Sequence, residues 1–418
     1  MQRIEADYLM ETPEDPARVA AIMAGEQSSG TFTAIPGETE AVKARAAATV
    51  TRLAIVEETT AGPSLPSAGL ALPPGTRFRR AQLTLSWPLA TVGPSLPNLL
   101  ATVAGNLFEL KPVTGLRLLD IRLPPAFAEA YAGPRFGIAG TRRLAGVTGR
   151  PIIGTIVKPS VGLTPEETAA LVAELCGAGI DFIKDDELQA DGPLCPFEAR
   201  VAAVMPVLHA AADRSGRMPM YAFNLTGEIE EMRRRHDTLL KHGASCMMAS
   251  LNSVGLAGII ELARFGTLPL HAHRNGWGYL SRHPLLGWSY RAWHKIWRLA
   301  GVDHMHVNGI GNKFAESDES SLDSARACLE PLFPDKPCTV MPVFSSAQGP
   351  RQAPATYAAL GSADLIVTAG GGIMAHPGGT AAGVTAMREA WQAALAGEAL
   401  EAYARTRPAL AAALERPA

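Results

Sequence analysis

Short apolar runs rich in β-branched residues recur along the second part of the chain, at intervals of 22 to 39 residues. Runs of this kind, bounded by turn residues, are typical of strands buried on both faces. Helical patterns of apolar positions occupy the segments between them. The eight runs begin near Ile152, Asp181, Met220, Cys246, Leu268, His304, Thr339 and Leu365. Eight strand–helix pairs in about 250 residues predict a (β/α)8 barrel. An open, doubly wound sheet would show the same alternation, but polar residues gather at the strand ends, which favours the barrel.

Two of the helices between these strands are predicted in some detail. The string TPEE that begins at Thr164 supplies an N-cap, a proline in the first turn and acidic residues facing the helix dipole. Residues 289–299 place Tyr290, Trp293 and Trp297 on one face of a helix, together with an isoleucine. Both patterns fit helices that pack against a barrel.

The first 140 residues or so show a different pattern, in which short strands and helices mix without a repeat. Apolar periodicity predicts strands over 4–10 and 82–87 and helices over 17–27 and 96–103. A Gly/Pro-rich stretch over 62–75 predicts a surface loop. This combination indicates an α+β domain.

Length and composition narrow the class of protein. The 418 residues fit an α+β domain over 1–140 followed by the barrel, with a C-terminal helical extension, over 141–418. With 38 Lys and Arg against 40 Asp and Glu, the formal net charge of −2 excludes a nucleic-acid binder held by bulk electrostatics. No apolar run reaches the roughly 20 residues of a membrane helix. The acidic N-terminus differs from a signal peptide, and the five scattered cysteines have no C-x-x-C spacing. We expect a soluble, cytoplasmic protein that binds neither nucleic acid nor membrane.

Candidate chemistry is densest where the second barrel strand ends, in the string DFIKDDE. Side chains alternate along a strand, so Lys184 and Asp186 share the face that leads into the barrel mouth, and Glu187 follows directly. Two carboxylates suit a hard cation such as Mg²⁺. Lys184 has two interpretations, which the residues leave open. It could form a salt bridge with the carboxylates, or its neutral amine could bind CO₂ as a carbamate and supply a third oxygen ligand.

Further polar residues follow the other predicted strands. Lys158 follows the first strand, and Lys313 lies in a glycine-containing loop after the sixth that could form a mobile lid. His271 and His273 share one face at the end of the fifth strand. Three consecutive glycines, 370–372, follow the eighth strand, where many barrels bind phosphate through backbone amides. The remaining polar positions at strand ends are Arg274, His306 and Ser345.

Taken in order, these strings resemble motifs of the large subunit of ribulose-bisphosphate carboxylase/oxygenase (RuBisCO), and more closely those of its RuBisCO-like relatives. The strings are GTIVKPSVGL at 154–163, DFIKDDE at 181–187, HAHR at 271–274 and GGGIMAHP at 370–377. Near the N-terminus, EQSSGTF at 26–32 and GNLF at 105–108 resemble two further motifs of the family. The resemblance covers essentially the whole chain. It implies a (β/α)8 barrel preceded by a smaller, ferredoxin-like α+β domain.

The resemblance also implies roles for the residues at the mouth. Lys184 would be carbamylated by CO₂ and would bind one Mg²⁺ together with Asp186 and Glu187. Lys158 would act as an acid or base at the reacting carbon, and His273 would hold or deprotonate a substrate hydroxyl.

Other residues would bind a phosphorylated small-molecule substrate. Arg274 and His306 would bind a distal anionic or hydroxyl group, and Lys313 would close over a carboxylate or CO₂. The residues implied to contact phosphate or the rest of the substrate are Thr31, Ser345, Gly370, Gly371, Glu26 and Asn106. The last two would reach the neighbouring subunit's barrel mouth, which implies a head-to-tail homodimer or a multiple of dimers.

Several positions depart from the family's carboxylases. Ser160 stands where they have a second lysine, Phe32 replaces a tryptophan, and Trp277 lies where a histidine would bind the distal phosphate. The string Ser-Ser-Ala at 345–347 replaces Ser-Gly-Gly, which adds side chains where backbone amides should meet a phosphate. A bisphosphate fits poorly at both ends, so we do not expect true ribulose-bisphosphate carboxylase activity.

What is retained indicates the reaction. Enolases and isomerases need the metal and one base, whereas carboxylate transfer and C–C cleavage need a second lysine. Both Lys158 and Lys313 are present. The combination resembles the RuBisCO-like branch of apionate degradation, which moves the carboxylate of 3-oxo-isoapionate 4-phosphate and hydrolyses the product to 3-phosphoglycerate and glycolate. We expect a Mg-dependent enzyme that acts through an enediolate on a phosphorylated sugar acid.

Two alternatives stay open. One is methionine salvage, as 2,3-diketo-5-methylthiopentyl 1-phosphate enolase or 5-methylthioribulose 1-phosphate isomerase, because Phe32, Trp277 and Phe344 could form an apolar pocket for a methylthio group. The other is a catalytically silent barrel used for binding. Loss of a metal ligand would indicate the silent barrel, and all three ligands are present.

Overall fold

The computed structural model describes residues 2–30, 35–67, 70 and 72–415, and divides the chain into two compact units. The first unit contains Met1–Ala132 and Gly276–Leu299, and the second contains Gly133–Asn275 and Ala300–Ala418. The sequence predicted a single boundary near residue 140, so this division differs by assigning 276–299 to the first unit. The physical reason is backbone pairing, because one strand of that segment joins the first unit's sheet.

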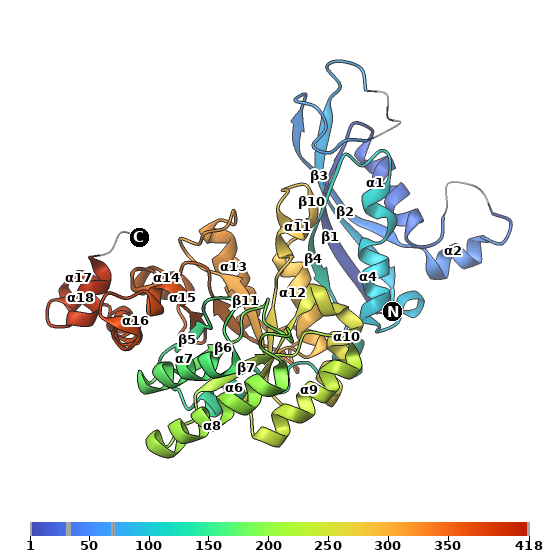
Figure 1. The fold of residues 1–418 in the computed structure, drawn as a ribbon. Coiled ribbons are helices and arrows are strands. Elements are labelled where there is room, and N and C mark those ends of the chain that lie inside the picture. The colour runs from blue at the N-terminus through green and yellow to red at the C-terminus, as the bar shows by residue number, and fades with distance from the viewer. Residues whose placement is uncertain (1, 31–34, 68–69, 71, 416–418) are drawn as a thin grey trace. The chain divides into compact units, whose positions relative to one another are not determined.

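The first unit is built on a five-stranded sheet with the order β10-β4-β1-β3-β2 (Figure 1). Its strands are β1 (Arg3–Thr12), β2 (Thr49–Thr59), β3 (Phe78–Pro88), β4 (Gly115–Arg122) and β10 (Leu286–Trp288). With helices α1 (Pro16–Glu26) and α4 (Leu96–Ala104), the first four strands form the βαββαβ order of a ferredoxin-like fold. The predicted strands and helices of this region are confirmed within a few residues. β2 was not predicted, because most of its side chains are exposed and no alternation marks it.

The other helical segments of this unit are short, except for one. They are α2 (Glu40–Ala46), α3 (Leu89–Val92), the 3-10 turn η1 (Asn106–Glu109), α5 (Ala126–Ala130) and α11 (Trp277–Ser281). The exception is α12 (Tyr290–Ala300), which confirms the helix predicted over 289–299. Its aromatic face is buried, and Trp293 packs against Trp277 with the two rings tilted by 42° and their centroids 4.8 Å apart.

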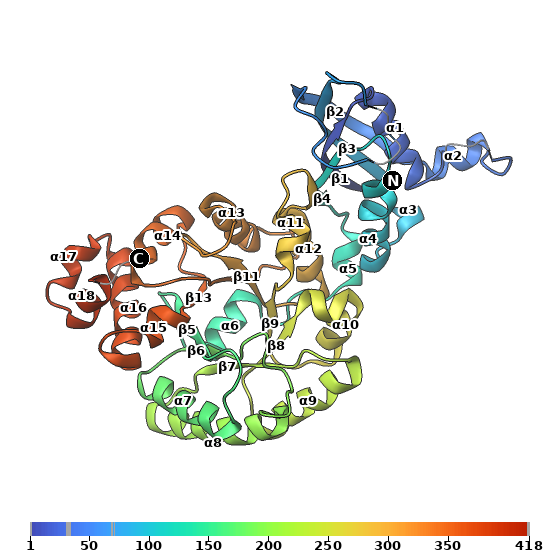
Figure 2. The same cartoon turned by 45° about the horizontal axis from the view of Figure 1, so that its top comes forward.

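Eight parallel strands of the second unit close into a barrel, as the sequence predicted (Figure 2). The strands are β5 (Ile152–Ile156), β6 (Phe182–Lys184), β7 (Met220–Asn224), β8 (Cys246–Ser250), β9 (Leu270–His273), β11 (His304–Asn308), β12 (Met341–Phe344) and β13 (Ile366–Thr368). Almost every residue of these strands is buried, which explains their continuous apolar runs. A core cluster fills part of the interior, with Ile152, Phe182 and Met220 among its members.

Helices follow the strands around the outside of the barrel (Figures 1 and 2). They are α7 (Pro165–Gly177), α8 (Phe197–Ser215), α9 (Ile229–His242), α10 (Leu251–Phe265), α13 (Asp318–Leu329), α14 (Ala353–Leu360), α15 (Gly370–Met374) and α16 (Gly379–Ala396). The unit also contains α6 (Gly137–Ala145), the 3-10 turn η2 (Pro350–Gln352), α17 (Leu400–Ala404) and α18 (Pro408–Leu414). The predicted start of α7 is confirmed, because Thr164 and Glu167 form a capping box.

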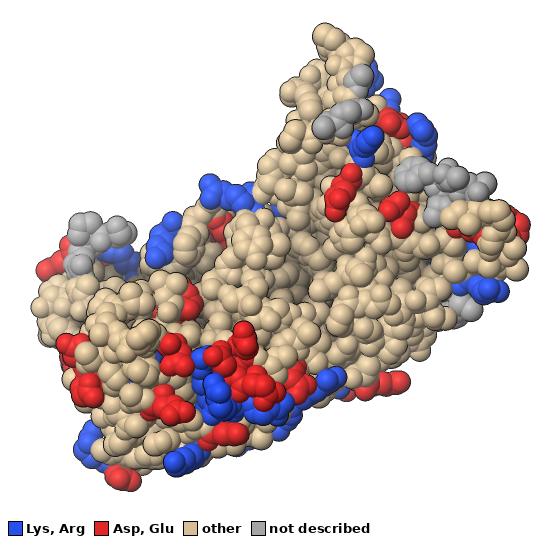
Figure 3. Space-filling view, turned by 45° about the vertical axis from the view of Figure 1, so that its right-hand side comes forward, with Lys and Arg blue, Asp and Glu red and all other residues tan. Residues whose placement is uncertain are grey.

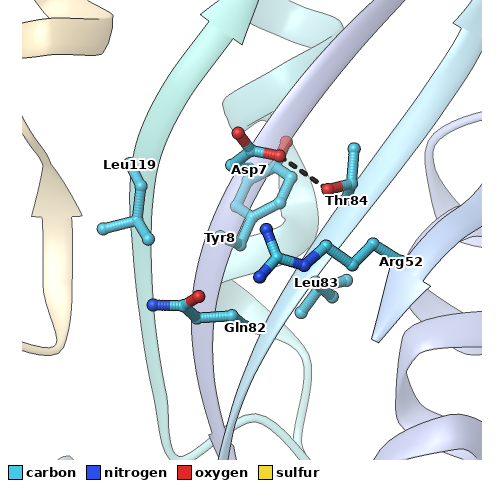
Figure 4. Close-up of a pocket in the computed structure, with 7 residues that line it drawn as sticks. All are labelled: Asp7, Tyr8, Arg52, Gln82, Leu83, Thr84 and Leu119. Carbon is cyan, nitrogen blue, oxygen red and sulfur yellow. Dashed lines mark hydrogen bonds between the residues drawn. The ribbon is translucent and has the colours of Figure 1, made fainter. Parts of the chain in front are cut away.

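Lys and Arg side chains are interspersed with Asp and Glu on the face shown in Figure 3. No helix in the described part of the chain is long and apolar enough to cross a membrane. Figure 4 shows a hollow on the first unit's sheet, where Thr84 donates a hydrogen bond to Asp7. None of the predicted site residues lines that hollow.

Candidate active site at the carboxyl ends of the barrel strands

Lys158 and Asp186 form the first pair at the barrel mouth. Lys158 lies two residues beyond β5, and its Nζ donates to Asp186 Oδ2 and to Ser160 Oγ, at 2.6 Å each. Burial would raise the pKa of Asp186, but the hydrogen bond from Lys158, together with the Leu188 N–H and the charge of Lys184, outweighs this and holds that pKa below its ordinary value. Ser160, the departure from the carboxylases, thus helps to orient the lysine that the motif retains.

Lys184 is the last residue of β6 and is fully buried. Its Nζ lies 3.5 Å from Glu187 Oε2, a longer contact than that between Lys158 and Asp186. Burial lowers the pKa of Lys184, although the neighbouring carboxylates act in the opposite direction. A lower pKa increases the fraction of the neutral amine, which is the form that reacts with CO₂.

His273 completes this group from β9. Its Nε2 lies 3.4 Å from Glu187 Oε2, and its Nδ1 accepts a hydrogen bond from the backbone N–H of Asn275 at 3.2 Å. Burial lowers the pKa of His273 to about 4, so the ring is neutral at neutral pH. With Nδ1 accepting, the ring proton belongs on Nε2, which faces the mouth. This tautomer can donate a hydrogen bond to a substrate oxygen.

A buried network behind the mouth holds the backbone that carries the two carboxylates. Asn224 donates from Nδ2 to the carbonyl oxygens of Asp186 and Glu187, at 3.2 Å each. Asp185 points the other way, where it accepts hydrogen bonds from Tyr221 Oη at 2.6 Å and from Arg200 Nε at 3.2 Å. No sequence pattern indicates this network, because its members lie on β7, on α8 and in the segment after β6, with no shared spacing.

Arg274 follows β9 and is mostly buried. It donates to Glu316 Oε2, and the same carboxylate oxygen accepts from Asn308 Nδ2 at 2.7 Å. Glu316 lies in the loop after β11, outside any periodic pattern, so sequence reasoning did not identify it. The pairing with Glu316 fixes the guanidinium of Arg274 at the mouth, where the resemblance implies that this residue binds a distal anionic or hydroxyl group of the substrate.

The loop that carries Lys313 is attached to the segment after β12. The backbone N–H of Lys313 donates to Ser346 Oγ at 3.2 Å, and Gln348 Nε2 donates to the carbonyl oxygen of Ile310 at 3.1 Å. Ser346 has a φ of 67°, in the left-handed region that glycine favours. Its hydroxyl thus has a use in this chain, as an anchor for the lysine loop.

The remaining predicted residues divide between the two units. His306 Nδ1 lies 3.0 Å from Ser345 Oγ at the ends of β11 and β12. Gly370 lies near Lys158, because a side-chain carbon added to it would stand 3.8 Å from Lys158 Cγ. Gly371 follows in the first turn of α15. In the first unit, Asn106 Nδ2 donates to Glu26 Oε1 at 3.1 Å, so that predicted pair is in contact.

Two residues predicted from the sequence to line the site, Thr31 and Phe32, lie outside the described residues. Trp277, suggested for an apolar substrate pocket, is buried against Trp293 inside the first unit. Its ring is therefore part of a hydrophobic core there.

The side chains at the mouth fit the implied Mg²⁺ only if Lys184 contributes. In the described ranges, no group of three or more His, Cys, Asp and Glu side chains gathers to hold a metal ion. The consecutive residues Asp186 and Glu187 supply two carboxylates. A carbamate on the buried Lys184 would add the third anionic oxygen ligand, the type that Mg²⁺ prefers.

The chain matches two family models that together span most of its length. The model for the ribulose bisphosphate carboxylase large chain, catalytic domain, matches residues 137–416, and the N-terminal domain model matches residues 6–127. The 3-oxo-isoapionate-4-phosphate transcarboxylase/hydrolase of Xanthobacter autotrophicus is 60% identical, over 99% of both chains. The 3-oxo-isoapionate-4-phosphate decarboxylase of Rhizobium etli is 44% identical, over 99% of this chain and 98% of the relative.

Solved structures of the same family are also similar to this chain. A rubisco-like protein from Burkholderia fungorum superimposes with a TM-score of 0.93 at 50% identity, covering 99% of this chain and 100% of the other. The dimeric archaeal Rubisco of Hyperthermus butylicus has a TM-score of 0.84 at 30% identity, covering 99% and 96%. The chain therefore belongs to the ribulose bisphosphate carboxylase large-chain family, as a RuBisCO-like enzyme rather than a true carboxylase.

Proposed function

We propose that the protein is a 3-oxo-isoapionate-4-phosphate transcarboxylase/hydrolase, which converts its substrate to 3-phosphoglycerate and glycolate. The observation that carries the proposal is the 60% identity, over nearly the full length of both chains, to a relative of that name. The methionine-salvage alternative loses support, because the Trp277 ring suggested for its apolar pocket is packed in the first unit's core.

Mg²⁺ would be held by carbamylated Lys184, Asp186 and Glu187. When bound, it would act as a Lewis acid that stabilises negative charge on the substrate's oxygens. The other steps depend on the chain's own side chains.

Lys158 and His273 are placed to serve the reacting carbon. The two hydrogen bonds of Lys158 Nζ hold its ammonium beside Asp186, from where it can deliver a proton to a carbanion. His273 is neutral with its proton on Nε2, so it can donate a hydrogen bond to a substrate hydroxyl or carbonyl oxygen. Of the two roles implied for this histidine, its tautomer favours holding the oxygen.

Lys313 is the second lysine that carboxylate transfer needs. Its loop is anchored to Ser346 through the backbone, while the side chain is exposed. The Nζ stands 5.4 Å from the centre of the Phe314 ring. An ammonium on a loop of this kind can close over a migrating carboxylate and offset its charge.

The experiment that tests the proposal follows the substrate's carboxylate carbon. Substrate labelled with ¹³C at the carboxylate is incubated with enzyme, Mg²⁺ and bicarbonate, and the products are identified by ¹³C and ³¹P NMR. Transcarboxylation and hydrolysis keep the label in a carboxylic acid and produce 3-phosphoglycerate. Labelled bicarbonate with a decarboxylated phosphosugar would instead show a decarboxylase, the activity named for the 44% identical relative. Turnover of methylthio-sugar phosphates alone would contradict both.

We also propose that the active unit is at least a dimer, to which Glu26 and Asn106 contribute across the subunit boundary. The pair is preorganised within one unit by its 3.1 Å hydrogen bond. Mixing inactive Glu26→Gln protein with inactive Lys158→Ala protein should restore activity, because one hybrid site would be intact. If labelled subunits exchange and activity does not return, each chain has a complete site and the proposal is wrong.

A further inference from the structure

The barrel interior contains a row of hydrogen-bonded side chains that the proposed chemistry leaves unused. β9 and β11 are neighbouring parallel strands, and His304 lies opposite His271 in their register. His306 lies two residues further along β11, on the same inward face. All three imidazoles are buried. Phe182 packs against two of them, with its ring centroid 5.1 Å from that of His271 and 6.1 Å from that of His304. In such apolar surroundings each polar nitrogen needs a partner.

The contacts form one continuous chain from helix α6 to the barrel mouth. Thr141 Oγ1 lies 2.9 Å from His304 Nε2, and His304 Nδ1 lies 3.4 Å from His271 Nδ1. On the other side of that ring, His271 Nε2 lies 2.9 Å from His306 Nε2. His306 Nδ1 then lies 3.0 Å from Ser345 Oγ. Each ring nitrogen of the three imidazoles therefore faces one member of the chain.

The three rings are uncharged at neutral pH. Burial lowers the pKa of His304 to about 3 and lowers the pKa values of His271 and His306 well below the ordinary value. A neutral imidazole has one N–H donor and one bare nitrogen that accepts. A chain of such rings must therefore have a direction, and reversing one ring reverses all of them.

The direction of this row of hydrogen bonds follows from its end at Thr141. The Thr141 hydroxyl donates to the carbonyl oxygen of Gly137, four residues earlier in α6. Its single proton is then committed, so Thr141 can only accept from His304. His304 therefore carries its proton on Nε2 and accepts at Nδ1 from His271. By the same rule, His271 accepts at Nε2 from His306, and His306 accepts at Nδ1 from Ser345.

We propose that Thr141 is a remote positioning residue that sets the direction of this chain, and with it the three histidine tautomers and the orientation of the Ser345 hydroxyl. With its proton directed to His306, Ser345 meets a bound ligand only as a hydrogen-bond acceptor. It is then suited to a ligand hydroxyl or N–H rather than to a fully ionised phosphate oxygen. The inference goes beyond the proposed function and does not depend on the identity of the substrate.

The tautomers can be measured directly in the intact, ligand-free protein. Histidine labelled with ¹⁵N is incorporated, and two-bond ¹H–¹⁵N correlations at neutral pH identify the protonated nitrogen of each ring. Single His→Gln variants assign the signals among the ten histidines. We expect protons on Nε2 of His304, Nδ1 of His271 and Nε2 of His306. Any other set of tautomers in the unmodified protein would overturn the proposal.

The variant that tests causation is Thr141→Val, which keeps the shape of the side chain and removes the hydroxyl. His304 Nε2–H would then have no acceptor. A buried N–H without an acceptor costs more free energy than a buried bare ring nitrogen without a donor. We therefore expect each of the three rings to change to its other neutral tautomer, so that His306 donates from Nδ1 to Ser345. Thr141→Ser, which retains the hydroxyl, should keep the original tautomers.

Thr168→Val is the matched control. Thr168 is also buried in a helix, and its hydroxyl also donates to the carbonyl oxygen four residues earlier, at 2.8 Å, but it lies outside the row of histidines. The Thr168→Val variant should leave the tautomers of the three histidines unchanged. Near-UV circular dichroism verifies that each variant is folded. If folded Thr141→Val protein retains all three original tautomers, Thr141 does not set the direction. Because no substrate is used, this result is separate from any failure of the proposed function.

Discussion

The two ends of the barrel treat buried carboxylates differently. At the amino end, Asp181 is fully buried and is surrounded by short contacts, with Arg150 at 2.6 and 3.0 Å, Arg217 at 2.8 Å and the Ile153 N–H at 2.9 Å. Asp303 lies in the same end and accepts hydrogen bonds from three backbone N–H groups. These carboxylates have the partners that burial requires.

At the carboxyl end, Lys158 and Asp186 form a short contact of 2.6 Å, but the contacts of Glu187 are looser. Glu187 lies 3.5 Å from Lys184 Nζ and 3.4 Å from His273 Nε2, and its side chain is about one-third exposed. The charges of Lys184 and Glu187 are therefore held near each other without a short hydrogen bond. The difference indicates that the amino end uses its charges for stability, whereas the mouth keeps charges available for ligands. Substitutions at the two ends should separate stability from activity.

The largest expected effect is on activity, from Lys184→Met at the mouth. Methionine keeps most of the volume of the lysine but cannot form a carbamate or bind an oxygen-preferring cation. We expect turnover to fall by about 10³-fold or more, with stability unchanged or increased because a buried amine is removed. Product assays with and without preincubation in CO₂ and Mg²⁺ measure the loss. Lys184→Glu, which restores an oxygen ligand, should recover a trace of activity. Full activity of Lys184→Met would show that no carbamate is needed.

The next largest effect should be on stability, from Asp181→Asn at the amino end. Loss of this carboxylate leaves the neighbouring guanidinium groups without their shared counter-ion, which costs about 3 kcal/mol for a buried ion pair. The urea midpoint of unfolding should fall, while kcat of the folded protein stays close to that of the unmodified enzyme. Asp213→Asn, at an exposed position, is the control and should change neither. An equal loss of kcat in Asp181→Asn would remove the distinction between the two ends.

A smaller effect is expected from Lys313→Ala, which tests whether the mouth performs carboxylate transfer. Removing one charge contact to the transition state should reduce formation of 3-phosphoglycerate by about 10²-fold. Proton exchange into the substrate should persist, because Lys158 and the metal ligands remain. Exposed Lys241→Ala is the control for loss of a surface lysine. Unchanged product formation in Lys313→Ala would argue for simple enolisation.

The comparison also shows what could be predicted from the sequence. Strand ends meet at one rim of a barrel, so Lys158 and Asp186 could be placed together from their positions after two apolar runs. Their 2.6 Å contact agrees with that placement. Glu316 and Asn308 could not be found in this way, because their partnership with Arg274 depends on how a loop folds. The same holds for β10, whose pairing with β4 is between segments far apart in the chain.

The smallest effect concerns the histidines that lie between the two ends, and it appears as a dependence of stability on pH. His271, His304 and His306 are buried as neutral rings, because burial lowers their pKa values, that of His304 to about 3. In the unfolded chain they would titrate at the ordinary value of about 6.5. Below that pH the unfolded state binds protons that the folded state does not, so the free energy of unfolding should fall as pH decreases. Each histidine contributes a slope of up to about 1.4 kcal/mol per pH unit.

The carboxylate at the amino end acts in a lower window of pH, which makes the two contributions separable. Burial raises the pKa of Asp181, but Arg150 and other partners outweigh this and lower it below its ordinary value. Its contribution to stability is therefore present above the ordinary carboxyl range and is lost only as pH falls through the lowered pKa. Between pH 6 and 4.5, urea unfolding should report mainly the histidines. His304→Gln should reduce the slope in that window by about 1.4 kcal/mol per pH unit, whereas His209→Gln, at an exposed position, should leave it unchanged. A slope that His304→Gln does not alter would mean that this ring is protonated in the folded barrel, contrary to its burial beside Phe182.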